Sequence, residues 1–191
     1  MGKQRGFTLI ELMVVIAIIG ILGTVLVPSI TNLTDKANAA KTVAVVDSLR
    51  TACDAYYSDV GAYGLEYATP WYTGAANHRL AFSYGTGWNG PYIKSPLSAG
   101  DNPWKNYVLL YANTTGWHTD GGGVGFDMDG DGTVDTSAVG NYIVFYSVPA
   151  AVGTIINNLV DGTQEGADWN TTGKFEFRTN SYGVFHVTGG R

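Results

Sequence analysis

The chain of 191 residues is long enough for one modest domain with its own core beside a terminal segment. It carries 11 Lys and Arg against 16 Asp and Glu, and the basic residues do not cluster, which argues against broad electrostatic binding of nucleic acid. The lone Cys53 excludes an internal disulfide, and the 26 glycines together with 13% aromatic residues favour a turn-rich β domain over a helical bundle.

The first 28 residues combine a short basic head with a long apolar run. Lys3 and Arg5 precede Gly6, and the one charge within residues 7–27 is Glu11. A helix over these positions, rising about 1.5 Å per residue, spans roughly the 30 Å hydrocarbon core of a bilayer. Positive charge before the run predicts a cytoplasmic N-terminus, with everything after Pro28 on the other side of the membrane.

An ordinary secretory signal peptide is the alternative for this segment, and it fits poorly. The apolar run is too long, no small-x-small cleavage site ends it, and Glu11 sits near its beginning. A carboxylate within a membrane helix is costly, so an ionisable group there marks a functional position by default. Glu11 therefore needs a partner.

Gly6 followed by the residues FTLIEL, with Pro28 closing the apolar run, resembles the N-terminus of type IV pilins and type II secretion pseudopilins. The resemblance implies that a prepilin peptidase cuts between Gly6 and Phe7 and methylates the new amine. It also implies that Glu11 pairs with the terminal amine of Phe7 in a neighbouring subunit. Opposite charges attract strongly in a low dielectric and either one alone is penalised, so such a pair sets the register of assembly.

The resemblance divides the chain into three parts. Residues 1–6 are the leader peptide, residues 7–28 are the transmembrane and filament-core helix, and residues 29–191 are a periplasmic or extracellular globular domain that includes the second half of the helix. Removal of the leader lowers the count of Lys and Arg from 11 to 9, which leaves the mature chain clearly acidic.

A helical pattern continues past Pro28, which is expected to bend or loosen the helix without ending it. Apolar residues recur at steps of three or four, or a multiple, and predict the stripe that packs on a domain. The stripe consists of Ile30, Leu33, Ala37, Ala40, Ala44, Leu49, Cys53, Tyr56 and Val60. Cys53 is interpreted as a small buried hydrophobe. The helix is predicted to end between Ser58 and Gly61.

Residues 63–95 are predicted to be irregular, and they are rich in aromatics and glycine. Two interpretations stay open: a connection pinned by buried rings, or a surface that contacts a neighbouring subunit. The stretch Gly90-Pro91-Tyr92, followed by Asn102-Pro103-Trp104, is similar to a segment of major pseudopilins, although Lys105 stands where that family usually has a glycine. This similarity favours the secretion branch over the pilus branch.

Four strands are predicted from short runs of β-branched and aromatic residues, at 107–112, 142–148, 175–179 and 183–188, with a tight hairpin joining the last two. Residues 149–160 are predicted to form a short helix closed by Asp161-Gly162. The fold class is therefore α+β: a long N-terminal helix packed on a small antiparallel sheet, as in pilins.

The segment DMDGDGTVD at 127–135 resembles the first part of an EF-hand calcium loop. Its oxygen ligands are predicted to be Asp127, Asp129, Asp131, Thr133 through its carbonyl, and Asp135. Ala138 replaces the bidentate glutamate of the EF-hand, so weak affinity is expected unless the fold adds a ligand such as Asp120. The alternative is a solvated acidic turn, although close carboxylates without a cation would repel one another.

Catalysis finds little support in the sequence. His78, His118 and His186 are scattered, and the chain lacks metalloprotease, phosphate-binding and dinucleotide motifs. Each histidine is interpreted as a surface or packing residue, and the protein is predicted not to be an enzyme.

The predicted function is that of a structural subunit that polymerises into a helical filament. The filament is either a type II secretion pseudopilus or a type IV pilus for adhesion or motility. The resemblance implies identical subunits, prepilin peptidase, an inner-membrane assembly platform and minor pilins as partners. It places the chain in the inner membrane before assembly, and in a periplasmic or surface filament afterwards. The alternatives are a minor pilin acting as a calcium-dependent binding module at the tip, and an enzyme anchored by the helix.

Overall fold

The computed structural model describes residues 6–70, 72, 74–113, 140–162, 173–178 and 182–189. The chain divides into two compact units, Met1–Ala37 and Asn38–Arg191, and each is described here by itself. The helix α1, Leu9–Val60, contributes to both units and runs through Pro28 without interruption, as the sequence predicts. It ends where Gly61 adopts a φ of 70° and donates its N–H to the carbonyl of Tyr57.

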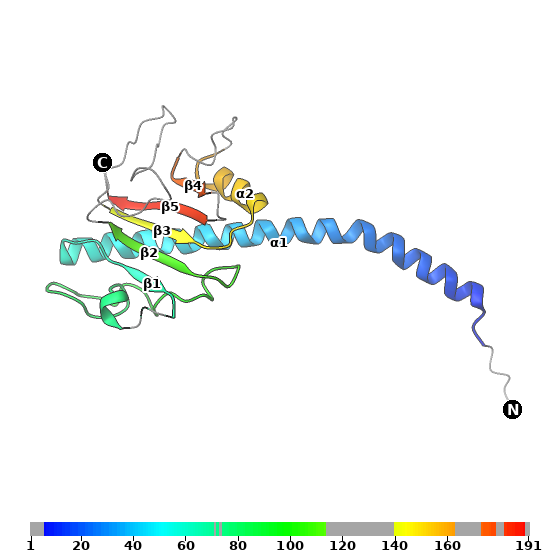
Figure 1. Ribbon diagram of the computed structural model, residues 1–191, viewed down its shortest axis with the longest axis horizontal. Coiled ribbons are helices and arrows are strands. Elements are labelled where there is room, and N and C mark those ends of the chain that lie inside the picture. Colours follow the sequence, from blue (N-terminus) through cyan, green and yellow to red (C-terminus); the bar gives the residue numbers. More distant parts are fainter. Residues whose placement is uncertain are drawn as a thin grey trace. The chain divides into compact units, whose positions relative to one another are not determined.

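The second unit is an antiparallel sheet packed on the C-terminal part of α1 (Figure 1). Its strand order is β1-β2-β3-β5-β4, and each neighbouring pair is antiparallel. The strands are β1 (Glu66–Ala68), β2 (Val108–Asn113), β3 (Gly140–Phe145), β4 (Phe175–Arg178) and β5 (Tyr182–Gly189). A short 3-10 helix, Ala75–Asn77, and the helix α2, Ala150–Val160, complete the described elements. The predicted α+β fold is thus confirmed.

The face of α1 that packs on the sheet differs in part from the predicted stripe. Leu49, Cys53 and Tyr56 are buried as predicted, whereas Ala40 and Ala44 are exposed. On that part of the helix the buried positions are Ala39, Thr42 and Val46. Alanine carries little apolar surface, so alanines alone indicate a helical face weakly. Thr42 can be buried because its hydroxyl donates to the carbonyl of Asn38 at 2.9 Å.

The core of the second unit joins this face of α1 to one face of the sheet. Its largest fully buried side chains include Tyr56, Leu80, Phe145, Phe175 and Phe185. The rings of Phe145 and Phe185 meet edge to face, with centroids 5.6 Å apart. Alternate residues of each strand supply this face, as the two-residue period of a strand requires.

The predicted strand positions are confirmed with shifted boundaries, and one strand was missed. The strand β1 was not predicted, because three residues within an aromatic and glycine-rich segment give too short a pattern. The strand β3 begins earlier, at Gly140-Asn141, because the buried Asn141 side chain donates to the carbonyls of Gly64 and Tyr111 at 2.7 and 2.9 Å. It ends before the predicted Val148, since Ser147 has a φ of 61°.

The turn before β2 is held by a buried asparagine. Asn102 donates from Nδ2 to the carbonyls of Tyr107 and Tyr146, both at 2.9 Å, and its Oδ1 accepts the N–H of Trp104. Lys105 adopts a φ of 55° in this turn. A left-handed conformation is where glycine fits best, so the lysine at this position is strained.

The aromatic segment 63–95 contains some rings that are bonded to the fold and others that are exposed. Trp88 donates its indole N–H to the carbonyl of Arg79, and Tyr92 donates its hydroxyl to Asp59, which pins these rings to the fold. The side chains of Tyr72, Phe82 and Tyr84 are exposed. A contact of these rings with another subunit stays a prediction.

The hairpin turn at 179–181 lies outside the described residues.

Candidate functional site

The peptide bond between Gly6 and Phe7 lies just before the first turn of α1. Gly6 has open space around its Cα, with no atom within 4 Å of an added Cβ, and the Phe7 side chain is 87% exposed. Neither residue belongs to a helix or strand. A peptidase can cleave an exposed bond outside regular structure readily, because no secondary structure has to open first.

Thr8 and Glu11 form a capping box at the start of α1. The Glu11 carboxylate accepts the backbone N–H of Thr8 at 2.8 Å and its hydroxyl at 2.7 Å, and the Glu11 N–H donates back to the Thr8 hydroxyl at 3.3 Å. These bonds satisfy donors that every helix leaves free in its first turn. The Thr-x-x-Glu spacing is the sequence signal for such a box, and it was not used in predicting the role of Glu11.

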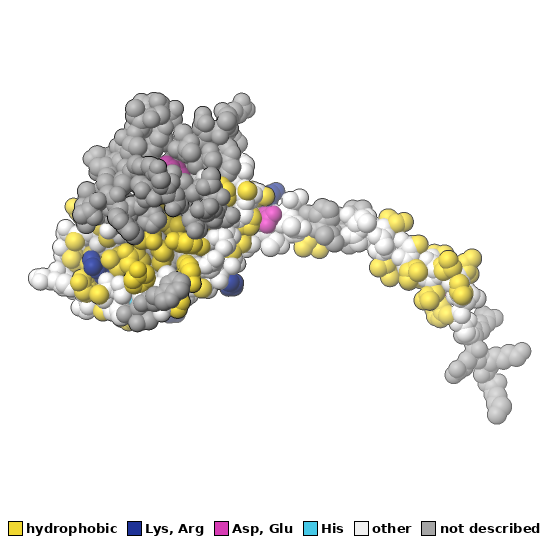
Figure 2. All heavy atoms as spheres, viewed as in Figure 1, with side chains coloured by type: hydrophobic (Ala, Val, Ile, Leu, Met, Phe, Trp, Pro, Cys, Tyr) yellow, Lys and Arg dark blue, Asp and Glu magenta, His cyan; other side chains and the backbone are white. Residues whose placement is uncertain are grey.

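The first part of α1 exposes apolar side chains on every face. The exposed fractions of the large ones between Phe7 and Leu22 range from 47% to 87%. They belong to Phe7, Leu9, Ile10, Leu12, Met13, Val14, Val15, Ile16, Ile18, Ile19, Ile21 and Leu22. Figure 2 shows hydrophobic side chains gathered over this part of the first unit. A helix that is apolar all round is stable in an apolar environment, either lipid or other protein.

Within the described residues, no helix combines the length and the hydropathy that crossing a membrane requires. The membrane span predicted for residues 7–28 is therefore not confirmed.

The predicted calcium ligands lie outside the described residues. This applies to Asp127, Asp129, Asp131, Thr133 and Asp135, and to the additional candidate Asp120. Within the part of the chain that is described, no three Asp, Glu, His or Cys side chains come together as a metal site would require. Calcium binding stays a prediction.

Cys53 is fully buried against the sheet, in line with its predicted packing role. Burial raises the pKa of its thiol, and the carboxylates of Asp54 and Glu66 raise it further. A thiol with a raised pKa holds its proton and is a poor nucleophile.

His118 and the side chain of His186 lie outside the described residues.

His78 is buried and paired with Glu66, which is itself completely buried. His78 Nδ1 lies 2.9 Å from Glu66 Oε2, and Nε2 lies 3.2 Å from the carbonyl of Tyr72. The other Glu66 oxygen accepts the N–H groups of Leu80 and Ala81 at 2.8 and 3.1 Å. Burial raises the pKa of the Glu66 carboxyl, with the hydrogen bonds from His78 and the two amides acting in the opposite direction. The prediction that His78 is a packing residue omitted this pair, since sequence spacing does not join positions 66 and 78.

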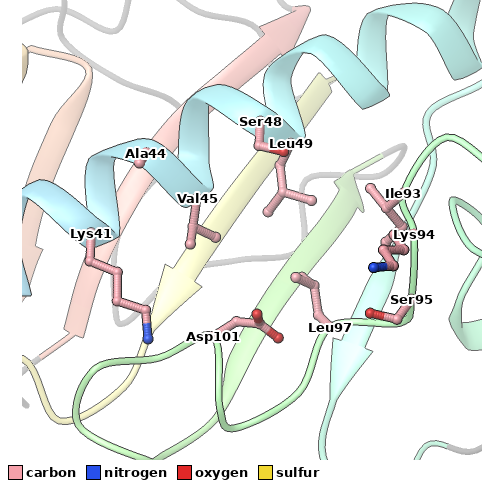
Figure 3. A pocket seen from close by; sticks show the side chains of 10 residues that line it. All are labelled: Lys41, Ala44, Val45, Ser48, Leu49, Ile93, Lys94, Ser95, Leu97 and Asp101. Atoms are coloured by element: carbon pink, nitrogen blue, oxygen red, sulfur yellow. The ribbon is translucent and has the colours of Figure 1, made fainter.

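A cavity of about 300 Å³ lies between α1 and the segment 93–101 (Figure 3). Val45, Leu49 and Leu97 supply apolar lining, and Lys41 from α1 and Lys94 from the segment lie at opposite ends of the cavity. The Lys41 ammonium already donates to the carbonyl of Gly100, and Asp101 accepts bonds from Ser98. The bond from Lys41 holds the segment on the helix, and the bonds from Ser98 to Asp101 close a turn within the segment. The residues that line the cavity include no nucleophile paired with a base.

The chain resembles known proteins over part of its length. Residues 1–27 match the family described as "Prokaryotic N-terminal methylation motif". The chain is 44% identical over 61 residues to "Type II secretion system core protein G" of Pectobacterium carotovorum subsp. carotovorum, which covers 32% of this chain and 39% of the relative. The protein of the same description in Escherichia coli (strain K12) is 47% identical over 57 residues, covering 30% and 39%.

A "Fimbrial protein" of Pseudomonas aeruginosa is 44% identical over 54 residues, which is 28% of this chain and 35% of the relative. The chain thus spans about two fifths of the length of the curated relatives it matches. No solved structure matches the chain.

Proposed function

We propose that the protein is a structural subunit of a filament. The proposal is supported by its prokaryotic N-terminal methylation motif and by the resemblance of its matched part to secretion pseudopilins and a fimbrial protein. The observation that carries the proposal is the first part of α1, which is apolar on every face and follows an exposed Gly6–Phe7 bond. Apolar surface of this extent is stabilised by burial. In a helical filament, the same helix of neighbouring copies supplies that burial.

Processing prepares the subunit for assembly. Prepilin peptidase cuts between Gly6 and Phe7, removes residues 1–6 and methylates the amine of Phe7. The segment 7–28 holds the uncut chain in the inner membrane, with residues 29–191 on the outer side, and an inner-membrane assembly platform then moves it into the filament. The cut removes Lys3 and Arg5, leaving an apolar end with one amine.

Glu11 then has two partners in turn. Within its own chain it accepts bonds from Thr8, and in the filament it accepts the charged amine of Phe7 from a neighbouring copy. The two functions are compatible, because a carboxylate has about four lone-pair positions and the Thr8 bonds use one oxygen. A buried charge left without its partner is heavily penalised, so the pair sets the axial register of the subunits.

Of the two filament types, the secretion pseudopilus is favoured by the resemblance of Gly90-Pro91-Tyr92 and Asn102-Pro103-Trp104 to major pseudopilins. A type IV pilus is the second candidate, and the match to a fimbrial protein supports it. A minor pilin acting as a calcium-dependent binding module at the tip differs from both in its low abundance. None of the three is an enzyme.

Calcium is proposed to bind the acidic segment 127–135, which lies between β2 and β3 in the sequence. Asp127, Asp129, Asp131 and Asp135, with the carbonyl of Thr133, supply hard oxygen ligands at the alternate spacing that calcium takes. Bound calcium would neutralise carboxylates that otherwise repel one another.

Electron microscopy of cells that overproduce the protein, with mass spectrometry of the subunit, tests the proposal. We expect filaments built of a chain that begins at methylated Phe7. An uncut chain beginning at Met1 and found only in membranes would contradict the filament subunit. Abundance in the filament separates a major subunit from a minor one, and loss of protein secretion on deletion separates a pseudopilus from a pilus.

A further inference from the structure

The contacts of Glu66 and His78 fix the number of protons that the buried pair holds. His78 Nε2 faces the carbonyl of Tyr72 at 3.2 Å, and a carbonyl only accepts, so Nε2 carries a proton. The contact of 2.9 Å between Nδ1 and Glu66 Oε2 needs a proton as well. That proton sits either on Nδ1, giving an imidazolium and a carboxylate, or on Oε2, giving two neutral groups. In both forms the closed pair has no net charge.

The pair ties an exposed segment to the sheet. Glu66 lies on β1, and its other oxygen accepts the N–H groups of Leu80 and Ala81, which follow the 3-10 helix. His78 joins this carboxylate to the backbone of Tyr72, and its ring meets the ring of Phe82 edge on at 6.3 Å. The exposed side chains of Tyr72 and Phe82 therefore depend on the pair for their position.

Among the described residues, the titratable groups near the pair keep their own charge states over the pH range in question. On α1, the buried thiol of Cys53 faces the carboxylate and keeps its proton. The guanidinium of Arg79 lies over the ring of Tyr84 at 4.4 Å, and its Nε donates to the carbonyl of Ala76. Tyr67, beside Glu66 on β1, has a pKa raised by burial and stays neutral over the same pH range.

We propose that Glu66 and His78 form a proton-dependent latch, which holds the carbonyl of Tyr72 and the N–H groups of Leu80 and Ala81 while the pair holds one shared proton, and loosens these contacts when that proton is lost. The latch acts within one subunit, so it is independent of the filament proposal. It gives the aromatic surface around Tyr72 and Phe82 a dependence on the surrounding pH.

The direction of the pH dependence follows from comparing the closed and open latch. In the open latch both side chains are solvated, and in water a carboxyl side chain loses its proton near about pH 4.3 and an imidazole near about pH 6.5. Between about pH 4.3 and about pH 6.5 the open pair also holds one proton, on the histidine, and the balance does not change. Above about pH 6.5 the open pair loses this proton and the closed pair keeps it, so opening becomes up to about tenfold more favourable with each pH unit.

The variant Glu66→Gln tests the latch, because the glutamine copies the protonated carboxyl. Its carbonyl accepts the two amides and its NH₂ donates to Nδ1 of a neutral His78, whose Nε2–H still bonds Tyr72. Amide exchange of Leu80 and Ala81, measured between pH 6.5 and 9 on the full chain in detergent and corrected for intrinsic rates, reports opening. We expect protection to fall by up to about tenfold per pH unit in the wild type and to stay level in Glu66→Gln.

The control variant is Asp47→Asn, which removes an exposed ion pair with Arg50 and leaves Glu66 intact. It should keep the wild-type pH profile. Parallel profiles in the wild type and Glu66→Gln would overturn the latch. If Glu66→Gln does not fold, NMR of the wild type decides instead. At pH 7.5 either the ring nitrogens of His78 must show an imidazolium or the carboxyl carbon of Glu66 a bound proton, and absence of both overturns the proposal.

Discussion

At the scale of single residues, Glu11 carries two roles that can be separated by substitution. Its carboxylate caps the first turn of its own helix through Thr8, and we propose that its charge pairs with the Phe7 amine of another copy. The cap needs an oxygen acceptor, which glutamine also supplies. The intersubunit pair needs a negative charge, which glutamine lacks.

Glu11→Gln is therefore expected to keep the helix start and to abolish incorporation into filaments. Thr8→Val removes the hydroxyl from the box and is expected to cost about 1 kcal/mol of helix stability while filaments still form. The fraction of subunit that sediments with sheared filaments measures incorporation for both variants. Normal filaments from Glu11→Gln would contradict the charge-pair role.

Lys105 provides a second test at one position, because its φ of 55° is costly for a residue with a side chain. Lys105→Gly should raise the free energy of unfolding by about 0.5 to 1 kcal/mol, since relief of the strain exceeds the added entropy of the unfolded chain. Lys105→Ala removes the same ammonium without relieving the backbone and should give no gain. Thermal melting of the three proteins compares them, and an equal gain from alanine would mean that charge, not strain, is responsible.

At the scale of elements, the end of α1 is covered by a glycine turn. A Cβ on Gly87 would lie 2.5 Å from the backbone oxygen of Asp59, in the last turn of the helix. Gly85 has a similar φ, 90° against 88°, but its Cβ would lie 4.0 Å from the nearest atom, in Val60. The two positions share the backbone penalty and differ in the close approach.

Gly87→Ala is expected to lower the melting temperature clearly more than Gly85→Ala does. Both variants lose roughly 1 kcal/mol through the left-handed backbone. Gly87→Ala also displaces the turn from Asp59, where backbone atoms cannot give way as a side chain can. Equal losses, measured by thermal unfolding of both variants, would show that the contact at Asp59 adds nothing.

The two α-helices and four strands were predictable because each carries a local signal. The helix α2 shows apolar spacing between Pro149 and Asp161-Gly162, and the strands have β-branched or aromatic runs. The strand β1 was not predictable, because its place depends on pairing with β2 and on Glu66, a residue that rarely prefers a buried strand. The rotation of the buried face of α1 towards Ala39 and Thr42 likewise follows from packing, which alanine periodicity does not determine.

At the scale of the whole molecule, the candidate site was predictable only in part. The order of Gly6, Phe7 and Glu11 is a local pattern, so sequence sufficed to find it, and the Thr8 cap was equally available as Thr-x-x-Glu. The Glu66–His78 pair was not, because it joins residues through a turn whose path the sequence does not specify. The proposed contact of Glu11 with Phe7 involves a second copy, which no property of a single chain determines.

Calcium is expected to stabilise the whole protein through the segment 127–135. Any ligand that binds only the folded state raises its stability, by about 2.7 kcal/mol at a hundred times its dissociation constant. The melting temperature should therefore rise with calcium and fall again with a chelator, and magnesium should do little because it prefers a tighter octahedral shell. Asp129→Asn with Asp131→Asn should remove the calcium response. No heat of binding and no rise in melting temperature would contradict the site.

The burial of Cys53 has a practical consequence for following assembly. The protein has no other cysteine, and this one lies in the core with its thiol protonated. A cysteine introduced at an exposed position such as Ser95 would be the single group that a maleimide dye reaches in the native subunit. In the proposed filaments, subunits can thus be labelled, and old and new ones distinguished by colour, without altering the core.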